Sequence, residues 1–426
     1  MFLGLLLMRK ETRTVILSSI GGSLEFFDFT IYALFAPYIR QVFFPAQDAI
    51  TGLLSTFGVF ALGYLARPLG GIIFGYLGDC YGRCIAFSSC IFIMAVSTLF
   101  IGLLPGYNNI GVAAPIVLTL LRIIQGISVG GEIPGSCIFT AEHLFKKRRG
   151  LAIGIIFMFI TLGNFWGSAL GYVLEKLIKQ PEMLNWGWRI PFIIGFVVGI
   201  LSYFLRKKVY ETSIYNNMKE SDKIEKFPLL TLIRKKPGLI LVGFGLTALS
   251  AATVSFILYL PSYLTVILGE KAASSYLVTT CGFLTLAFCS MVFGFISDCI
   301  GRKLVIITGA VLSAICGYAA FYMVTHTGGG HALEFAIWIA ATVGIVNGVY
   351  GISITELFPA NVRASGMGLS FNMGLALIGG LSPFLFTYFI KITGSLMAPY
   401  YIFGVCAVIT CVSGIFWKSR FSCLDR

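Results

Sequence analysis

The chain has 426 residues, of which 57% are hydrophobic and only 12% are charged, and its mean hydropathy is +0.90. Soluble domains carry about 25% charged residues, so this composition excludes a soluble protein and indicates an integral membrane protein. The net charge of +13 fits a protein that gathers lysine and arginine on one side of a membrane and is attracted to anionic lipid. A lipid bilayer is therefore an expected partner, and nucleic acid is not.

The apolar runs are long and continuous, which predicts spanning α-helices and not the alternating strands of a membrane barrel. We expect an all-α integral membrane protein with twelve spans in two six-helix halves. The halves would cover residues 1–206 and 238–426, and the charged segment 207–237 would link them as a cytoplasmic loop. The expected spans are 14–38, 51–77, 85–104, 111–141, 150–175, 189–206, 238–266, 273–296, 303–324, 333–356, 364–390 and 398–417.

Lysine and arginine are distributed unevenly among the expected loops, and this bias predicts the orientation. With the N-terminus inside, 23 of the 31 lysines and arginines fall on the cytoplasmic side and six fall outside. Arg67 and Arg122 remain within spans. Both termini are therefore expected in the cytoplasm, as an even number of spans requires.

A charged loop motif occurs twice. Residues 75–84 read GYLGDCYGRC and residues 294–303 read GFISDCIGRK, which places Asp298 219 residues after Asp79. A second Glu…Arg spacing repeats at an offset of 214 residues. Two repeats at nearly equal offset indicate two homologous halves. The charged residues of these repeats are Asp79, Arg83, Glu142, Arg149, Asp298, Arg302, Glu356 and Arg363.

Two six-helix halves with an Asp-x-x-x-Arg loop after the second and eighth spans resemble the major facilitator superfamily. Four further segments resemble the metabolite:proton symporter family within it, whose members carry proline and betaine, citrate, α-ketoglutarate or shikimate. The resemblance implies a monomer in the bacterial inner membrane that moves a small solute with a proton by alternating access. The segments are GSLEFFDF at 22–29, RPLGG at 67–71, QGISVGGE at 125–132 and WGWRIPF at 186–192.

Ionisable groups inside spans are costly and are functional candidates by default. Glu25 and Asp28 lie three residues apart, so they share one face of the first span. Two carboxylates so close in a medium of low dielectric cannot both ionise cheaply, and one of them is expected to carry the coupled proton. Which of the two does so stays open, as does a permanent structural pairing of one carboxylate with an arginine.

Arg122 is expected near the middle of the fourth span. A buried guanidinium is costly there unless it pairs with a carboxylate or faces a cavity. We expect it to pair with Glu25 or Asp28, and protonation of the carboxylate would release it to bind a solute carboxylate bidentately. A static ion pair is the alternative. Glu132 would line the inner half of the path or pair with an arginine. Arg67 is expected to pair with Glu132 or to reach the interface rather than to touch solute.

Neutral polar and aromatic groups could complete a solute site, because aromatic faces bind quaternary ammonium ions. Ordinary helix packing is the alternative for each of them. The candidates are Asn164 and Trp166 on the fifth span, Tyr259 on the seventh, Asn347 and Tyr350 on the tenth, and Asn372 on the eleventh.

The repeated charges are expected at the cytoplasmic surface. There they resemble the charge networks that close the inner gate in this family. We expect Arg83 to pair with Glu142, and Arg302 to pair with Glu356.

The leading hypothesis is a proton symporter of a zwitterionic or carboxylated solute similar to proline or glycine betaine. Di- and tricarboxylates such as citrate or α-ketoglutarate are the alternative substrates, and an uncoupled uniporter or exchanger is the alternative mechanism. An enzyme is not expected, and neither is a cofactor or a metal. The three histidines, His143, His326 and His331, lie in expected loops without a cluster of ligand spacing.

Overall fold

The structure is a computed structural model, and the part of the chain that it describes is made of helices. It describes residues 30–45, 48–81, 83–130, 132–143, 148–206, 236–327, 330–359 and 363–419, with shorter pieces at 19, 22–23, 26–27, 232 and 234. The first expected span and the central loop therefore lie largely outside the described residues.

The first half contains five spans whose described bounds agree with the expected ones to within a few residues. Its second and fourth spans are each divided into two helices. In chain order the elements are α3 (Ala36–Phe43), α4 (Ala49–Leu65), α5 (Arg67–Tyr81), α6 (Arg83–Leu103), α7 (Tyr107–Ile110), α8 (Ala113–Val129), α9 (Glu132–His143), α10 (Arg149–Leu177), α11 (Gln180–Asn185), η2 (Gly187–Arg189) and α12 (Ile190–Arg206).

The second half contains six spans. A π-helical turn, η3 or η5, occurs in its first and fifth spans, and the fourth is divided into two helices. The elements are α15 (Pro237–Ser262), η3 (Tyr263–Ile267), α16 (Ala272–Ile300), α17 (Arg302–His326), α18 (Ala332–Asn347), α19 (Tyr350–Leu357), α20 (Arg363–Gly374), η5 (Leu375–Gly380), α21 (Ser382–Thr393) and α22 (Ala398–Phe416).

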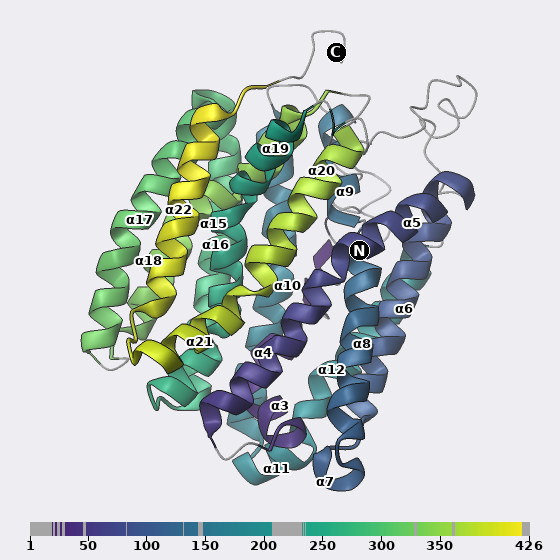
Figure 1. The fold of residues 1–426 in the computed structure, drawn as a ribbon, viewed down its shortest axis with the longest axis vertical. Helices are drawn as coiled ribbons and strands as arrows, with labels where there is room; N and C mark the ends of the chain where they lie inside the picture. The colour runs from purple at the N-terminus through teal and green to yellow at the C-terminus, as the bar shows by residue number, and fades with distance from the viewer. Residues whose placement is uncertain are drawn as a thin grey trace.

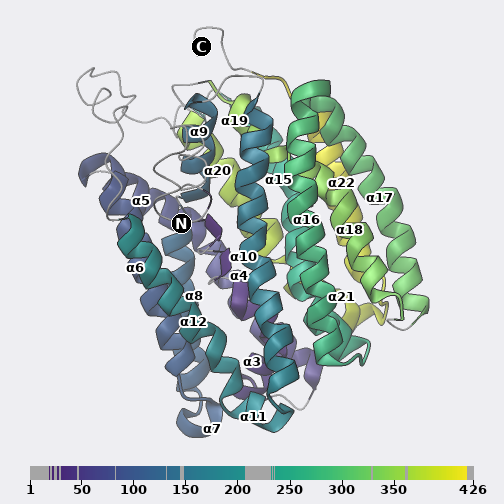
Figure 2. The same ribbon diagram turned by 180° about the vertical axis from the view of Figure 1, so that it is seen from behind.

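The two halves lie side by side (Figure 1), with the purple and blue helices of the first half on one side and the green and yellow helices of the second on the other. Helices α10 and α16 run next to each other between the halves, as the reverse view in Figure 2 also shows. Within the described residues, nine spans are long and apolar enough to cross a membrane. The shorter apolar helices α6 and α12 occupy the places of the third and sixth expected spans.

Glycines allow the second and fourth spans to cross in close contact. A Cβ added to Gly126 on α8 would lie well inside van der Waals distance of the Gly63 carbonyl oxygen on α4. A Cβ on Gly70 would overlap the Ile127 carbonyl oxygen in the same way. In lipid, such small residues let backbones approach closely and pack.

We therefore expect Gly126→Ala to destabilise the protein by about 1–3 kcal/mol, because the added methyl group must push two backbones apart. Thermal unfolding of the detergent-purified protein measures this loss. Gly58→Ala on α4 is the matched control, since no atom lies within 4 Å of its added Cβ. Equal stability of the two variants would show that the α4–α8 contact is looser than described.

Candidate functional site

A small cavity lies between the two halves, near the middle of the long helices. Asn164 of α10 lines it from the first half, and Ser250 of α15, Asn347 of α18 and Tyr350 of α19 line it from the second. Its volume of about 20 Å³ suffices for about one water molecule. A solute of several heavy atoms can therefore enter only after the helices move.

The expected residues Asn164, Asn347 and Tyr350 thus meet in one place, although they come from three different helices. Asn164 is 1% exposed, and its Oδ1 has no hydrogen-bond partner among the described residues. A buried amide oxygen without a partner is costly, so this atom is suited to accepting a hydrogen bond from a ligand.

Aromatic rings form much of the rest of the wall. The Tyr350 ring stacks on Phe371 with a centroid separation of 6.0 Å and lies 4.7 Å from the ring of Phe157. Phe26 and Tyr64 also line the cavity. The cavity is therefore apolar around a few polar groups, as small-molecule sites usually are.

Both arginines within spans are buried, but they lie in different places. The Arg67 guanidinium is 5.0 Å from the centroid of the Tyr64 ring and 5.7 Å from that of Phe26. Because these two rings line the cavity, the positive charge of Arg67 lies behind the cavity wall.

Arg122 lies inside the first half and does not line the cavity. Its guanidinium lies 4.4 Å from the centroid of the Tyr32 ring, and its Nη1 donates to Gln125 Oε1 at 2.7 Å. Gln125 Nε2 in turn donates to the hydroxyl of Thr98. Arg122 therefore faces the first span and the third, and not the space between the halves.

Three other expected residues lie outside the cavity lining. Trp166 is 60% exposed, since a step of two residues from Asn164 turns it by about 200° to the far face of α10. Tyr259 is buried, and its hydroxyl accepts a bond of 3.1 Å from Thr387. Asn372 donates to the carbonyl of Gly130 at 2.7 Å and so joins the two halves.

Six of the expected charged residues have side chains that the structure does not describe. Glu25 and Asp28 lie outside the described residues. The same holds for the side chains of Asp79, Arg83, Glu132 and Glu142, which belong to helices whose backbones are described.

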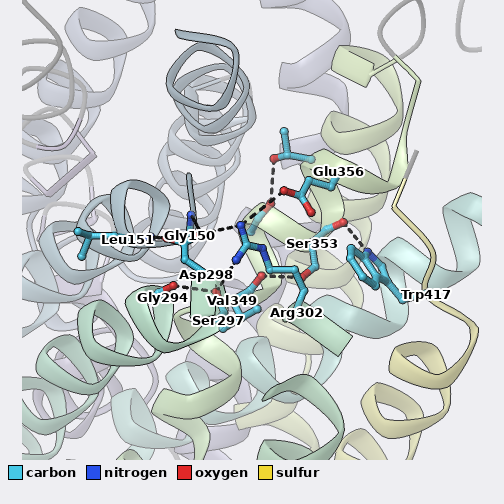
Figure 3. Close-up of polar contacts among 12 residues, drawn as sticks. Gly150, Leu151, Gly294, Ser297, Asp298, Arg302, Val349, Ser353, Glu356 and Trp417 are labelled. Carbon is cyan, nitrogen blue, oxygen red and sulfur yellow. Dashed lines mark hydrogen bonds and ion pairs between the residues drawn. The ribbon is translucent and has the colours of Figure 1, made fainter. Parts of the chain in front are cut away.

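The second copy of the loop motif holds the two halves together at the end that the charge distribution predicts to be cytoplasmic. Asp298, near the end of α16, accepts bonds of 2.9 Å from the backbone N–H groups of Gly150 and Leu151, which begin α10 (Figure 3). A carboxylate at this position caps the helix and interacts favourably with the positive end of its dipole. Asp298 therefore joins the second half to the first.

Arg302 holds Asp298 in place. Gly301 has a φ of 95°, a conformation that suits glycine, and so lets the chain turn sharply between α16 and α17. Arg302 Nη2 consequently lies 2.7 Å from Asp298 Oδ1 and 3.6 Å from Glu356 Oε1. The expected pairing of Arg302 with Glu356 is present. We name Asp298, Arg302 and Glu356 the inner charge cluster.

Two further residues of the repeats are buried near this end of the molecule. Arg149 is the first residue of α10 and is 5% exposed. Arg363 is the first residue of α20, and its Nε donates to the carbonyl of Phe358 at 3.2 Å.

The halves also touch at the opposite end. Tyr276 of α16 donates to the carbonyl of Leu34 at 2.8 Å. Lys391 of α21 donates to the Thr51 hydroxyl at 2.6 Å, and its Nζ lies 3.4 Å from Asp48 Oδ2, just before α4. The described residues therefore join the two halves at both ends.

Residues 14–237 and 213–419 each match the protein family described as "Sugar (and other) transporter". The proline/betaine transporter of Escherichia coli strain K12 is 31% identical over 96% of this chain and 84% of its own length. The putative proline/betaine transporter of Staphylococcus aureus strain COL is 32% identical over 94% of this chain and 87% of its own length. The chain belongs to the sugar (and other) transporter family, within the major facilitator superfamily.

Solved structures of this superfamily share the fold. The crystal structure of a D-xylose-proton symporter superposes with a TM-score of 0.75 at 19% identity, over 95% of this chain and 97% of that one. A partially occluded, inward-open xylose transporter from E. coli gives 0.74 at 19% identity, over 93% and 95%. The prediction of a twelve-helix fold in two halves is thereby confirmed. The protein is a multi-pass transporter of small molecules in the bacterial inner membrane.

Two features of this transporter were not anticipated from its sequence. Ser250 and Ser255 line the cavity, and nothing in their surroundings along the chain distinguishes them from the other serines of apolar helices. Capping of α10 by Asp298 joins residues from different halves, which the loop motif alone does not indicate.

The contact between Asp48 and Lys391 yields a prediction on pH. Hydrogen bonds from the Thr51 hydroxyl and the Ile50 backbone, with Lys391 nearby, hold the pKa of the Asp48 carboxyl at about 2. The stabilisation from this carboxylate is thus present above its unfolded pKa and is lost as the pH falls through about 2. Asp48→Asn should change transport rate without changing the shape of the pH profile between about pH 5 and pH 8. A profile of transport against pH that shifts in this variant would contradict the assignment.

Proposed function

We propose that this transporter carries a small zwitterionic or carboxylated solute, similar to proline or glycine betaine, together with a proton by alternating access. The observation that carries the proposal is the small cavity between the halves, lined by Asn347, Tyr350 and Asn164, whose Oδ1 has no partner among the described residues. The relatives named as proline/betaine transporters support the solute class.

The charge of the wall favours a zwitterion over a di- or tricarboxylate. None of the described lining residues is a lysine or an arginine, so several carboxylates would lack counter-ions there. A solute with a single carboxylate is better accommodated, because Arg67 lies behind Tyr64 and Phe26 and contributes a positive potential. The aromatic rings suit the cationic end of the solute.

For the proton, we propose Glu25 or Asp28, with Arg122 as the responding cation. Tyr32 follows Asp28 by four residues, which is about one helical turn, and the Arg122 guanidinium stacks on the Tyr32 ring. Arg122 is thus positioned to pair with a carboxylate of the first span. Protonation would weaken that pair and so alter how the first span packs.

The inner charge cluster would act as a gate. In this structure, Asp298 caps α10 across the interface, and Arg302 with Glu356 holds it there. Opening toward the cytoplasm would break the two backbone bonds to Gly150 and Leu151. By the repeat, Asp79, Arg83 and Glu142 would form the corresponding cluster on the first half, with Arg149 and Arg363 beside the capped helices.

Asp298→Ala should shift the equilibrium toward the inward-open state by about 0.5–2 kcal/mol, the usual cost of losing an N-cap. Distances between spin labels on cysteines introduced at Arg148 and Leu304, in a cysteine-free background, would measure the shift. Lys303→Gln is the control, because Lys303 bonds to the carbonyl of Ile415 and not to α10. An unchanged distance distribution for Asp298→Ala would refute the gate.

Uptake into proteoliposomes tests solute and coupling together. Labelled proline, glycine betaine, citrate, α-ketoglutarate and shikimate would be offered with and without an imposed proton gradient. We expect accumulation of a zwitterion that requires the gradient. Glu25→Gln with Asp28→Asn should abolish gradient-driven accumulation while sparing exchange of solute for solute. Equal accumulation by this double variant and the wild type would exclude coupling at these two residues.

A further inference from the structure

The directions of the hydrogen bonds around Asn347, which lines the cavity, can be assigned, starting from Ser290 on α16 behind the wall. Its hydroxyl donates to the carbonyl of Leu286 at 2.6 Å, and a carbonyl can only accept. Ser290 Oγ is therefore left to accept from Asn347, whose Nδ2 lies 2.8 Å away. The amide of Asn347 is thus fixed with its nitrogen toward Ser290 and its oxygen toward Ser250.

Ser250 in turn has a fixed direction. Its hydroxyl donates to Asn347 Oδ1, because that oxygen has no hydrogen to give. The proton of Ser250 is consequently used within the wall. Ser250 Oγ is therefore an acceptor toward the cavity, where the Tyr350 hydroxyl is its neighbour.

The hydroxyl proton of Ser255, five residues further along α15, is also used within the protein. Its hydroxyl donates to the carbonyl of Gly379 at 2.6 Å. Gly379 belongs to the π-helical turn η5, where backbone carbonyls lose their usual α-helical partners. Ser255 is 1% exposed and lines the cavity, so its oxygen is also an acceptor toward the interior.

The first half adds a third acceptor from across the cavity. Asn164 Oδ1 is buried and has no partner among the residues that the structure describes. The wall therefore presents three acceptor oxygens, two from α15 and one from α10, among aromatic rings.

We infer that the site selects zwitterions whose cationic end carries N–H groups, and that it discriminates against quaternary ammonium ions of the same size. This inference rests on the proposed function and narrows its solute class. Aromatic faces alone would accept either cation. The three acceptors decide, since a quaternary ion would cover them without satisfying them, whereas a secondary ammonium donates to them. Donation to both α10 and α15 would also hold the two halves around the solute.

Proline and glycine betaine provide a matched pair of probes. Each has five carbons and one carboxylate, but proline carries two N–H bonds on its ammonium and glycine betaine carries none. We expect unlabelled glycine betaine to compete with labelled proline, in proteoliposomes of the wild-type protein, at least tenfold more weakly than unlabelled proline does. N,N-dimethylproline, which keeps the ring and loses both N–H bonds, should compete as weakly as glycine betaine.

Variants identify the acceptors responsible. Ser255→Ala and Asn164→Leu should each lower the ratio of the inhibition constant of glycine betaine to that of proline by about threefold or more. The main cause would be weaker binding of proline. Ser262→Ala is the control, because it removes a buried hydroxyl from α15 outside the cavity lining, and it should leave the ratio unchanged.

The outcomes separate this inference from the proposed function. Equal competition by proline and glycine betaine, or a ratio that neither variant changes, would overturn the inferred selectivity and leave the transport of zwitterions standing. Failure of the wild-type protein to take up or bind either zwitterion, while it accumulates citrate or another carboxylate of the uptake panel, would overturn the proposed solute class and the inference with it.

Discussion

The contact between α10 and α16 is the constraint on which the rest of the structure depends. A Cβ on Gly294 would lie 2.6 Å from the Gly150 carbonyl oxygen and 3.0 Å from the Gly154 Cα, so the two helices touch backbone to backbone. This approach brings Asp298 to the first turn of α10. Further along the same pair of helices lie Asn164, which lines the cavity, and Ser290, which accepts a bond from the lining residue Asn347. One helix pair therefore supports both the inner charge cluster and the cavity between the halves.

Much of the architecture could be predicted, because lipid imposes long apolar helices and the repeat divides them into halves. The Arg302–Glu356 pair also followed from the repeat. The capping of α10 by Asp298 could not be predicted, because its partners are backbone N–H groups of the other half. Every residue except proline has such a group, so the sequence does not distinguish these two. A motif shows which side chains are charged, but the packing of the halves determines which helix end they reach.

The site was predicted in part, for a related reason. Asn164, Asn347 and Tyr350 are conspicuous polar groups in apolar spans and do meet at the cavity. Trp166 faces away, which the spacing from Asn164 along α10 could have indicated. Ser250 and Ser255 were missed because most serines in membrane helices bond to their own helix, as Ser290 does to Leu286. Hydrogen bonds between different helices can be identified only from the three-dimensional structure.

The two ends of the transporter are closed by charge pairs in very different surroundings. The side chains of Asp298 and Arg302 are 3% and 9% exposed, whereas those of Asp48 and Lys391 are 51% and 41% exposed. Dissolved ions screen exposed charges strongly and buried ones weakly. The Asp48–Lys391 pair is therefore weakened by salt in the solution that it faces, whereas the buried cluster at the other end is much less sensitive to salt.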